Sequence, residues 1–222
     1  MTESEQQNIK EQFKDILSNG IAPILKTAGF KKSGCNFHAR AGEMDWCINI
    51  QKERWGFNDY TWQFTINIGV TWNDYTTSLF DKACDFPLES SCPIRARIGM
   101  FMGKGDYWFV LRPNQDHLPV KEQICSTITE KVLPVLNGIK CFDDAWKYII
   151  KDSTWCESLT NLFSNKPEPK VFEISPFGFY MLCLQTEKEK EAKLFRAELE
   201  QRGANLEILD KILATYKKNL KQ

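Results

Sequence analysis

The strongest constraint on the fold is a strict alternation of apolar and polar residues between positions 46 and 70. In residues 46–51 and 62–70, every second side chain is tryptophan, phenylalanine, isoleucine or valine. Successive side chains on a β-strand point to opposite faces, so this pattern predicts two strands, each with one apolar and one polar face. A helix would instead need apolar residues three or four positions apart. We therefore place these strands at the centre of an antiparallel sheet.

Shorter strands complete the predicted sheet, which covers about residues 30–112. One strand is expected within residues 30–40, and another begins at Cys92 and Pro93, with Ile94, Ala96 and Ile98 on its apolar face. A last strand is expected over residues 107–111. The segment 71–90 lacks alternation and is expected to hold a short helix.

Amphipathic helices precede and follow the predicted sheet. Residues 5–28 and 119–136 carry apolar side chains at helical spacing, which suits helices that cover the apolar face. Pro23 and Pro134 should each distort their helix, since proline lacks the backbone N–H donor and its ring clashes with the preceding turn. Two short helices are expected at residues 142–150 and 155–163.

The last part of the chain differs in character. Residues 165–170 contain two prolines and form the best linker candidate, and two amphipathic helices are expected beyond residue 184. We therefore predict an α+β domain over residues 1–164, with helices packed on one face of an antiparallel sheet. Residues 165–222 would form a C-terminal helical hairpin appendage. A homodimer through these helices is possible if their apolar stripe is not covered by the domain.

Composition and charge exclude several classes of protein. Lysine plus arginine and aspartate plus glutamate both number 29, so no global field favours nucleic acid or an anionic membrane. Nothing approaches the run of about 18 apolar residues that a membrane span needs. The first ten residues lack the pattern of a signal peptide, which favours a cytoplasmic location.

The eight cysteines are scattered through apolar patterns and lack the C-x-x-C spacing of metal or redox motifs. Together with the absence of an export signal, this favours reduced, mostly buried thiols. With two histidines in the chain, no metal site is predicted, and no cofactor is predicted either. Whether Cys84 and Cys92 approach each other stays open.

The polar face of the sheet is the first candidate site. Parity places amide, hydroxyl and guanidinium groups on one side, and guanidinium forks pair well with carboxylates and other anions. The simpler alternative is a solvated sheet face, where polar residues belong. The candidate ligand-binding residues are Asn49, Gln51, Thr65, Asn67, Arg95 and Arg97.

Aromatic residues in or beside the connections that leave the central strands are the second candidate. Such residues often anchor protein interfaces or stack on ligands. They can equally fold back onto a small satellite core, and this alternative stays open. The candidate partner-binding residues are Trp55, Phe57, Tyr60, Trp72 and Tyr75.

Signatures of catalysis are scarce. The stretch from Gly103 to Gly105 is too short for a phosphate loop, and no G-x-S-x-G motif occurs. Asp143 and Asp144 suit a helix start better than a catalytic pair. A cysteine near His38 is better explained as a buried structural thiol. No catalytic residue is therefore predicted.

Several spaced signatures lie at Phe37 and at residues 25–32, 48–52, 64–70, 92–99 and 106–109. Together they resemble an uncharacterised bacterial family, domain of unknown function 4304. The resemblance covers roughly residues 13–136. It implies a compact α+β domain and brings no established activity, substrate or catalytic residue. Some folds of similar logic serve as immunity proteins against bacterial toxins, which is an analogy of architecture alone.

Two functions remain open. The first is a non-enzymatic, cytoplasmic protein-binding domain, immunity-like or accessory, whose partner is another protein. The second is a small-molecule-binding, anion-binding or enzymatic domain that uses the polar sheet face. A concave pocket with converging polar groups would favour the second function. A flat polar face beside exposed aromatic residues would favour the first.

Overall fold

A computed structural model describes residues 2–53, 61–80, 84–150 and 170–219. The predicted helix at 155–163 lies outside these residues, as does the predicted linker apart from Lys170. Trp55, Phe57 and Tyr60 also lie outside them.

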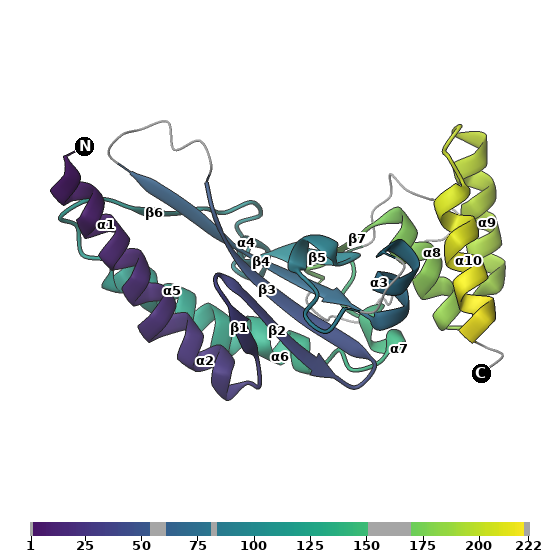
Figure 1. Cartoon of the computed structure of the whole chain (residues 1–222), viewed down its shortest axis with the longest axis horizontal. Helices are drawn as coiled ribbons and strands as arrows, with labels where there is room; N and C mark the ends of the chain where they lie inside the picture. The colour runs from purple at the N-terminus through teal and green to yellow at the C-terminus, as the bar shows by residue number, and fades with distance from the viewer. Residues whose placement is uncertain (1, 54–60, 81–83, 151–169, 220–222) are drawn as a thin grey trace.

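An antiparallel β-sheet forms the middle of the molecule (Figure 1). Its strands lie in the order β1, β2, β3, β4, β5, β7, and β6 pairs with β4 as well. Helices lie along one face of this sheet and at its two ends. The prediction of an α+β fold built on an antiparallel sheet is confirmed. The strands are β1 (Lys31–Ser33), β2 (Asn36–Ala41), β3 (Met44–Lys52), β4 (Trp62–Thr71), β5 (Ile94–Arg97), β6 (Phe109–Leu111) and β7 (Glu173–Ile174).

The predicted central pair is β3 and β4. Trp46 lies opposite Val70, and Ile50 lies opposite Ile66. Because side chains alternate between faces, this register gathers the apolar residues of both strands on one side, where all four of these residues are buried.

Three strand boundaries differ from the prediction. The expected single strand at 30–40 is a hairpin of β1 and β2, because Gly34 takes a positive φ of 60° and turns the chain. Ile98 does not continue β5 but begins helix α4 (Ile98–Phe101). A Cβ on the next residue, Gly99, would lie 2.0 Å from Gly105 O, so this glycine permits a close backbone passage there. The last predicted strand begins at Phe109, two residues after its predicted start at residue 107.

Two long helical segments cover the apolar face, and both contain a π-helical stretch. The first consists of α1 (Glu3–Asp15), a π-helix (Ile16–Ile21) and α2 (Ala22–Thr27). The second consists of α5 (Leu118–Thr127), a π-helix (Ile128–Val132) and α6 (Leu133–Asn137). In each, a proline is the second residue after the π-helix. A widened turn relieves the clash that a proline ring makes with the preceding turn, so the predicted distortions are confirmed.

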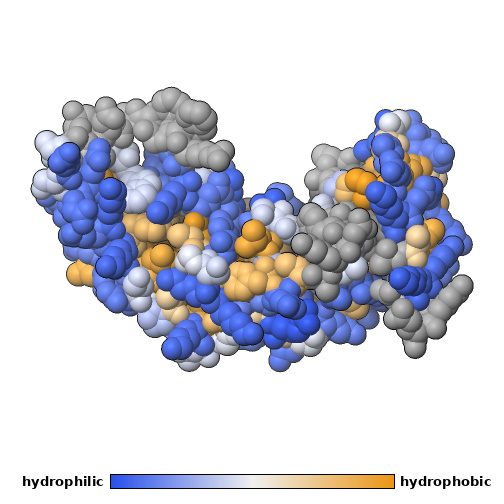
Figure 2. Space-filling model, in the orientation of Figure 1, coloured by the Kyte–Doolittle hydropathy of each residue, from blue (hydrophilic) through white to orange (hydrophobic). Residues whose placement is uncertain are grey.

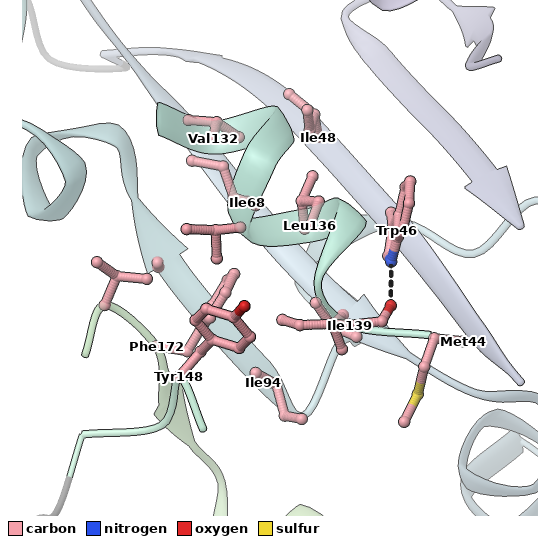
Figure 3. Close-up of a cluster of buried hydrophobic side chains, with 14 of the residues drawn as sticks. Met44, Trp46, Ile48, Ile68, Ile94, Val132, Leu136, Ile139, Tyr148 and Phe172 are labelled. Atoms are coloured by element: carbon pink, nitrogen blue, oxygen red, sulfur yellow. Dashed lines mark hydrogen bonds between the residues drawn. The ribbon is translucent and has the colours of Figure 1, made fainter. Parts of the chain in front are cut away.

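The main core lies between the second helical segment and the sheet (Figure 3). Val132 and Leu136 point from the helix toward Ile68 on β4, and all three are fully buried. Trp46 Nε1 donates a hydrogen bond to Ile139 O over 3.0 Å at the end of this helix. This bond gives two buried polar groups a partner, which offsets the cost of removing the indole N–H and the carbonyl from water.

The C-terminal part contributes to the sheet as well as forming helices. β7 pairs with β5, so Ile174 lies opposite Ile94. Three helices follow, and α10 packs against α8 and α3. The division of the chain at residue 164 stays a prediction. The remaining helices are α3 (Asn73–Phe80), α7 (Phe142–Ala145), α8 (Pro176–Gln185), α9 (Glu189–Gln201) and α10 (Glu207–Asn219).

The apolar stripe of the C-terminal helices is largely covered within the chain. Phe195 on α9 and Leu209 on α10 are buried, whereas Leu194 and Ile208 are exposed by 45% and 37%. The homodimer through these helices stays a prediction.

Figure 2 shows a hollowed face between two raised ends of the molecule. One end carries α1 and the other carries α9 and α10 (Figure 1). Hydrophobic residues gather in the middle of this face, and hydrophilic residues dominate the end that carries α1.

Candidate functional site

The pairing registers of β3, β4 and β5 place the candidate ligand residues on one face of the sheet. Asn49 lies opposite Asn67, which lies opposite Arg97, so one row of side chains crosses the three strands. Residues two positions apart on a strand share the same face. This face therefore carries the full predicted set: Asn49, Gln51, Thr65, Asn67, Arg95 and Arg97.

Hydrogen bonds within the face occupy much of its amide capacity. Asn49 Nδ2 donates to Asn36 Oδ1, and Asn67 Nδ2 donates to Gln51 Oε1, each over 2.7 Å. Thr65 is fully buried, and its Oγ1 donates to a backbone carbonyl over 2.9 Å. Thr65 is therefore out of reach of a ligand, whereas the other bonds fix the position of Asn67.

The segment 84–92 covers the neighbouring part of the same face, so the face is not simply solvated. Cys47 Sγ donates to Pro87 O over 3.2 Å. Beside Cys47, Gly69 lies beneath the segment, and a Cβ there would lie 2.6 Å from Cys92 Sγ. The glycine thus lets a short 3₁₀ turn (Glu89–Ser91) pack directly on the sheet.

A pocket of about 500 Å³ lies beside this covered area. Asn67, Arg95 and Arg97 line it, so three of the six predicted ligand residues meet there. β7 pairs with the first two residues of β5 and then ends, which leaves the far half of β5 beside the pocket. Further lining residues are Glu89, Met100, Asp106, Val171, Glu173 and Ser175.

The Arg95 guanidinium is anchored through its Nε atom. Its Nε donates to Glu89 Oε1 over 2.6 Å, and this hydrogen bond raises the pKa of Arg95. The Glu89 side chain is 4% exposed and the Arg95 side chain is 50% exposed. Within the described part of the chain, the two terminal nitrogens of Arg95 donate no hydrogen bond. They therefore present a free guanidinium edge.

The second arginine is fixed more fully. Arg97 forms an ion pair with Asp106, and its guanidinium lies 5.3 Å from the centre of the Trp108 ring. Glu173 on β7 lies opposite Arg95 and is exposed. Among the described residues Glu173 forms no ion pair, although its charge, after the hydrogen bond to Glu89, contributes to the raised pKa of Arg95. Two guanidinium groups thus share the pocket with three carboxylates, so the site is not a simple anion site.

The aromatic candidates divide into two groups. Trp72 and Tyr75 are 1% and 4% exposed and pack against each other with ring centres 5.3 Å apart. Trp72 also makes an edge-to-face contact with Phe142. Trp72 and Tyr75 therefore occupy core positions, which was the alternative to an exposed interface. Partner binding through Trp55, Phe57 and Tyr60 stays a prediction.

A buried polar cluster surrounds Asp45 on the same sheet face. His38 Nε2 lies 2.7 Å from Asp45 Oδ1, and Arg40 donates to both carboxylate oxygens. Burial alone would raise the pKa of Asp45, but the hydrogen bonds from His38 and Arg40 outweigh it and lower that pKa. Cys47 lies opposite His38 but is 1% exposed, which fits a structural thiol.

Cysteines and metal-binding groups show no further site in the part of the chain that the structure describes. Cys84 is exposed and Cys92 is buried, and both are free. Burial raises the pKa of the Cys92 thiol. Across the four described segments, no group of three or more histidine, cysteine or acidic residues could hold a metal ion.

The carboxylates of the pocket were not predicted as site residues. Glu89 and Glu173 come from segments that lack strand alternation, and Asp106 was interpreted as part of a turn. Their meeting depends on long-range packing, and no local pattern in the sequence indicates it. The ion pairs of Arg95 with Glu89 and of Arg97 with Asp106 were accordingly not predicted.

Comparisons with known proteins identify a family for this chain. A family model described as domain of unknown function 4304 matches residues 21–138, more than half of the chain. No curated protein and no solved structure matches. None of the helices within the described residues has the length and apolar character required to cross a membrane. The sheet face and two of the three carboxylates lie within the family match, whereas Glu173 lies outside it.

Proposed function

Because the chain belongs to the family of domain of unknown function 4304, which assigns no activity, we propose from the pocket that this protein binds a small zwitterionic ligand. The ligand would carry a carboxylate or phosphate at one end and an amine at the other, as an amino acid or a short peptide does. The observation that carries the proposal is the free guanidinium edge of Arg95 beside the unpaired carboxylate of Glu173.

The anionic end of the ligand would bind Arg95. Its Nε is already engaged by Glu89, so the fork is oriented and only its terminal nitrogens are left for the ligand. A planar guanidinium can donate two parallel hydrogen bonds to a carboxylate or phosphate, and an oriented fork loses less entropy when it does so.

The amine end would bind the acidic side of the pocket. Glu173 supplies an exposed carboxylate, and Asn67 supplies a side-chain carbonyl that accepts no hydrogen bond from the described residues. Asp106 is already neutralised by Arg97, so it adds little attraction. A ligand with anionic groups alone would meet repulsion from Glu173, and one with cationic groups alone would meet repulsion from Arg95.

The pocket favours binding over covalent catalysis. Ser175 lines it, but the Ser175 Oγ accepts a hydrogen bond from Gly178 N over 3.2 Å as the N-cap of α8. That hydroxyl therefore serves the helix start. The concave pocket supports this function over the alternative of a bacterial, cytoplasmic protein-binding domain, for which Trp72 and Tyr75 are no longer available as surface residues.

Isothermal titration calorimetry with free amino acids and dipeptides tests the proposal, with acetate and ethylamine as singly charged probes. The zwitterions should bind, and the singly charged probes should bind at least tenfold more weakly. Arg95→Lys keeps a positive charge beside Glu89 but loses the fork. It should weaken zwitterion binding about 10- to 100-fold, since a hydrogen bond to a charged group contributes about 1.5–3 kcal/mol.

Glu173→Gln and a matched control complete the experiment. Glu173→Gln should reduce the preference for zwitterions over plain carboxylates. Arg112→Gln, an exposed arginine that does not line the pocket, should leave affinity unchanged. Equal affinity of wild type and Arg95→Lys for every zwitterion, or no binding by any of them, would overturn the proposal.

A further inference from the structure

A groove of about 730 Å³ lies between α2 and the β1–β2 hairpin, away from the pocket beside β5. Ala22 and Pro23 on α2 form one wall, and Phe30 and Phe37 form the floor. Its volume is in the range of cavities that hold small organic ligands, about 300–1,000 Å³.

Three lysines line this groove. Lys26 comes from α2, whereas Lys31 and Lys32 come from β1, and all three are exposed. Of the two on β1, it is Lys32 that shares the sheet face of Phe37, because Lys31 lies opposite His38. None of them forms an ion pair with another described residue, and the described lining contains no acidic side chain. In a chain with zero net charge, this is a local concentration of uncompensated positive charge above an apolar floor.

The floor is recessed. Phe30 and Phe37 line the groove yet are only 4% and 2% exposed, so their rings cannot protrude. Membrane-surface proteins insert protruding apolar side chains into the bilayer. A recessed floor instead favours a detached apolar chain that enters the groove.

Protection of the sheet edge explains only part of this arrangement. β1 is an edge strand, and lysines on edge strands discourage pairing with other chains. That role fits Lys31 and Lys32. It does not explain Lys26, which lies on a helix and lines the same groove. A peptide strand added to β1 is also disfavoured, because the strand offers three residues for pairing.

We propose that this groove binds a free single-chain anionic amphiphile, such as a fatty acid. Its carboxylate lies between Lys26 and Lys32, and its aliphatic chain lies over Phe30 and Phe37. The site differs from the zwitterion pocket in ligand and in location, so either can fail without the other.

Calorimetry with decanoate, kept below its micelle concentration, tests the proposal. Dodecanoate should bind more tightly than decanoate, by up to about fourfold per added methylene, if each methylene is buried at about 0.8 kcal/mol. Decyltrimethylammonium, with the opposite charge and the same chain, should not bind measurably. The double variant Lys26→Glu/Lys32→Glu should lose at least tenfold in decanoate affinity.

A matched double variant controls for general charge effects. Lys10→Glu/Lys131→Glu reverses two exposed lysines that do not line the groove, and it should bind decanoate like wild type. Circular dichroism should show that all variants are folded, since every substituted side chain is exposed.

Three results would overturn the proposal. One is equal decanoate affinity in wild type and Lys26→Glu/Lys32→Glu. Another is equal binding of the cationic amphiphile. The third is binding to anionic phosphatidylglycerol vesicles without binding of monomeric decanoate, which would indicate a bilayer surface instead of a groove ligand.

Discussion

The ion pair between Glu89 and Arg95 should stabilise the fold as well as orient the binding fork. Replacing either partner alone removes one charge and leaves the other unpaired. We consider Glu89→Gln and Arg95→Met, which keep the approximate size of each side chain, and the double variant. The double-mutant cycle isolates the coupling energy of the pair.

The expected coupling follows from the burial of the two partners. Glu89 is almost fully buried, and breaking a buried pair typically costs about 3–5 kcal/mol. Arg95 is half exposed, and exposed pairs contribute only about 0.2–1 kcal/mol because water screens them. A pair with one partner in each environment should lie between these limits. We expect a coupling of about 2 kcal/mol, and Arg95→Met should be more damaging than Glu89→Gln because it leaves a buried carboxylate uncompensated.

Urea unfolding followed by tryptophan fluorescence at neutral pH measures the four free energies. The matched control is the pair Glu207 and Lys211 on α10, whose charged atoms are 3.8 Å apart and whose side chains are 70% and 62% exposed. Its cycle should give less than about 0.5 kcal/mol. A coupling for Glu89 and Arg95 no larger than that of the control pair would refute the reasoning from burial.

Three further predictions concern stability. Gly69→Ala places a Cβ 2.6 Å from Cys92 Sγ. Its overpacking cost of about 1–3 kcal/mol should exceed the gain of under about 1 kcal/mol from replacing glycine, so the urea midpoint should fall. Trp46→Phe leaves the buried Ile139 carbonyl without its donor and should cost about 2 kcal/mol in the same assay, and a loss below about 0.5 kcal/mol would contradict this. Folding lowers the pKa of Asp45. The ionised carboxylate therefore stabilises the fold above the unfolded pKa of about 4, and this stabilisation is lost as the pH falls through the folded pKa. Stability measured between about pH 5 and 2 should therefore fall less steeply in Asp45→Asn than in wild type.

Local patterns were sufficient to predict the framework of the fold. The alternation in residues 46–70 predicted β3 and β4, and their register follows from the need to bury one face. Pro23 and Pro134 correctly marked the points where two helices deviate from α-helical geometry. The hairpin at Gly34 was missed because a single glycine between Ser33 and Cys35 is compatible with both a strand and a turn.

Aromatic character did not indicate exposure. Trp72 was a candidate for a partner interface, yet it is among the largest fully buried side chains. Its environment is set by Phe142, a residue 70 positions away along the chain, and hydrophobicity is the same property that favours either an interface or a core. Local sequence therefore left both alternatives open, and long-range packing decided between them.

The sequence by itself determined that Asn67, Arg95 and Arg97 share one face of the sheet. Within β5 this follows from the period of two, and between β4 and β5 it follows because both strands bury their apolar side in the same core. Tertiary structure alone decided that these residues line a pocket, that Glu89 holds Arg95 in place, and that Glu173 lies beside it. Those contacts join segments separated by loops and helices. Their formation depends on how the whole core packs, because a carboxylate far along the chain has no local pattern that encodes its partner.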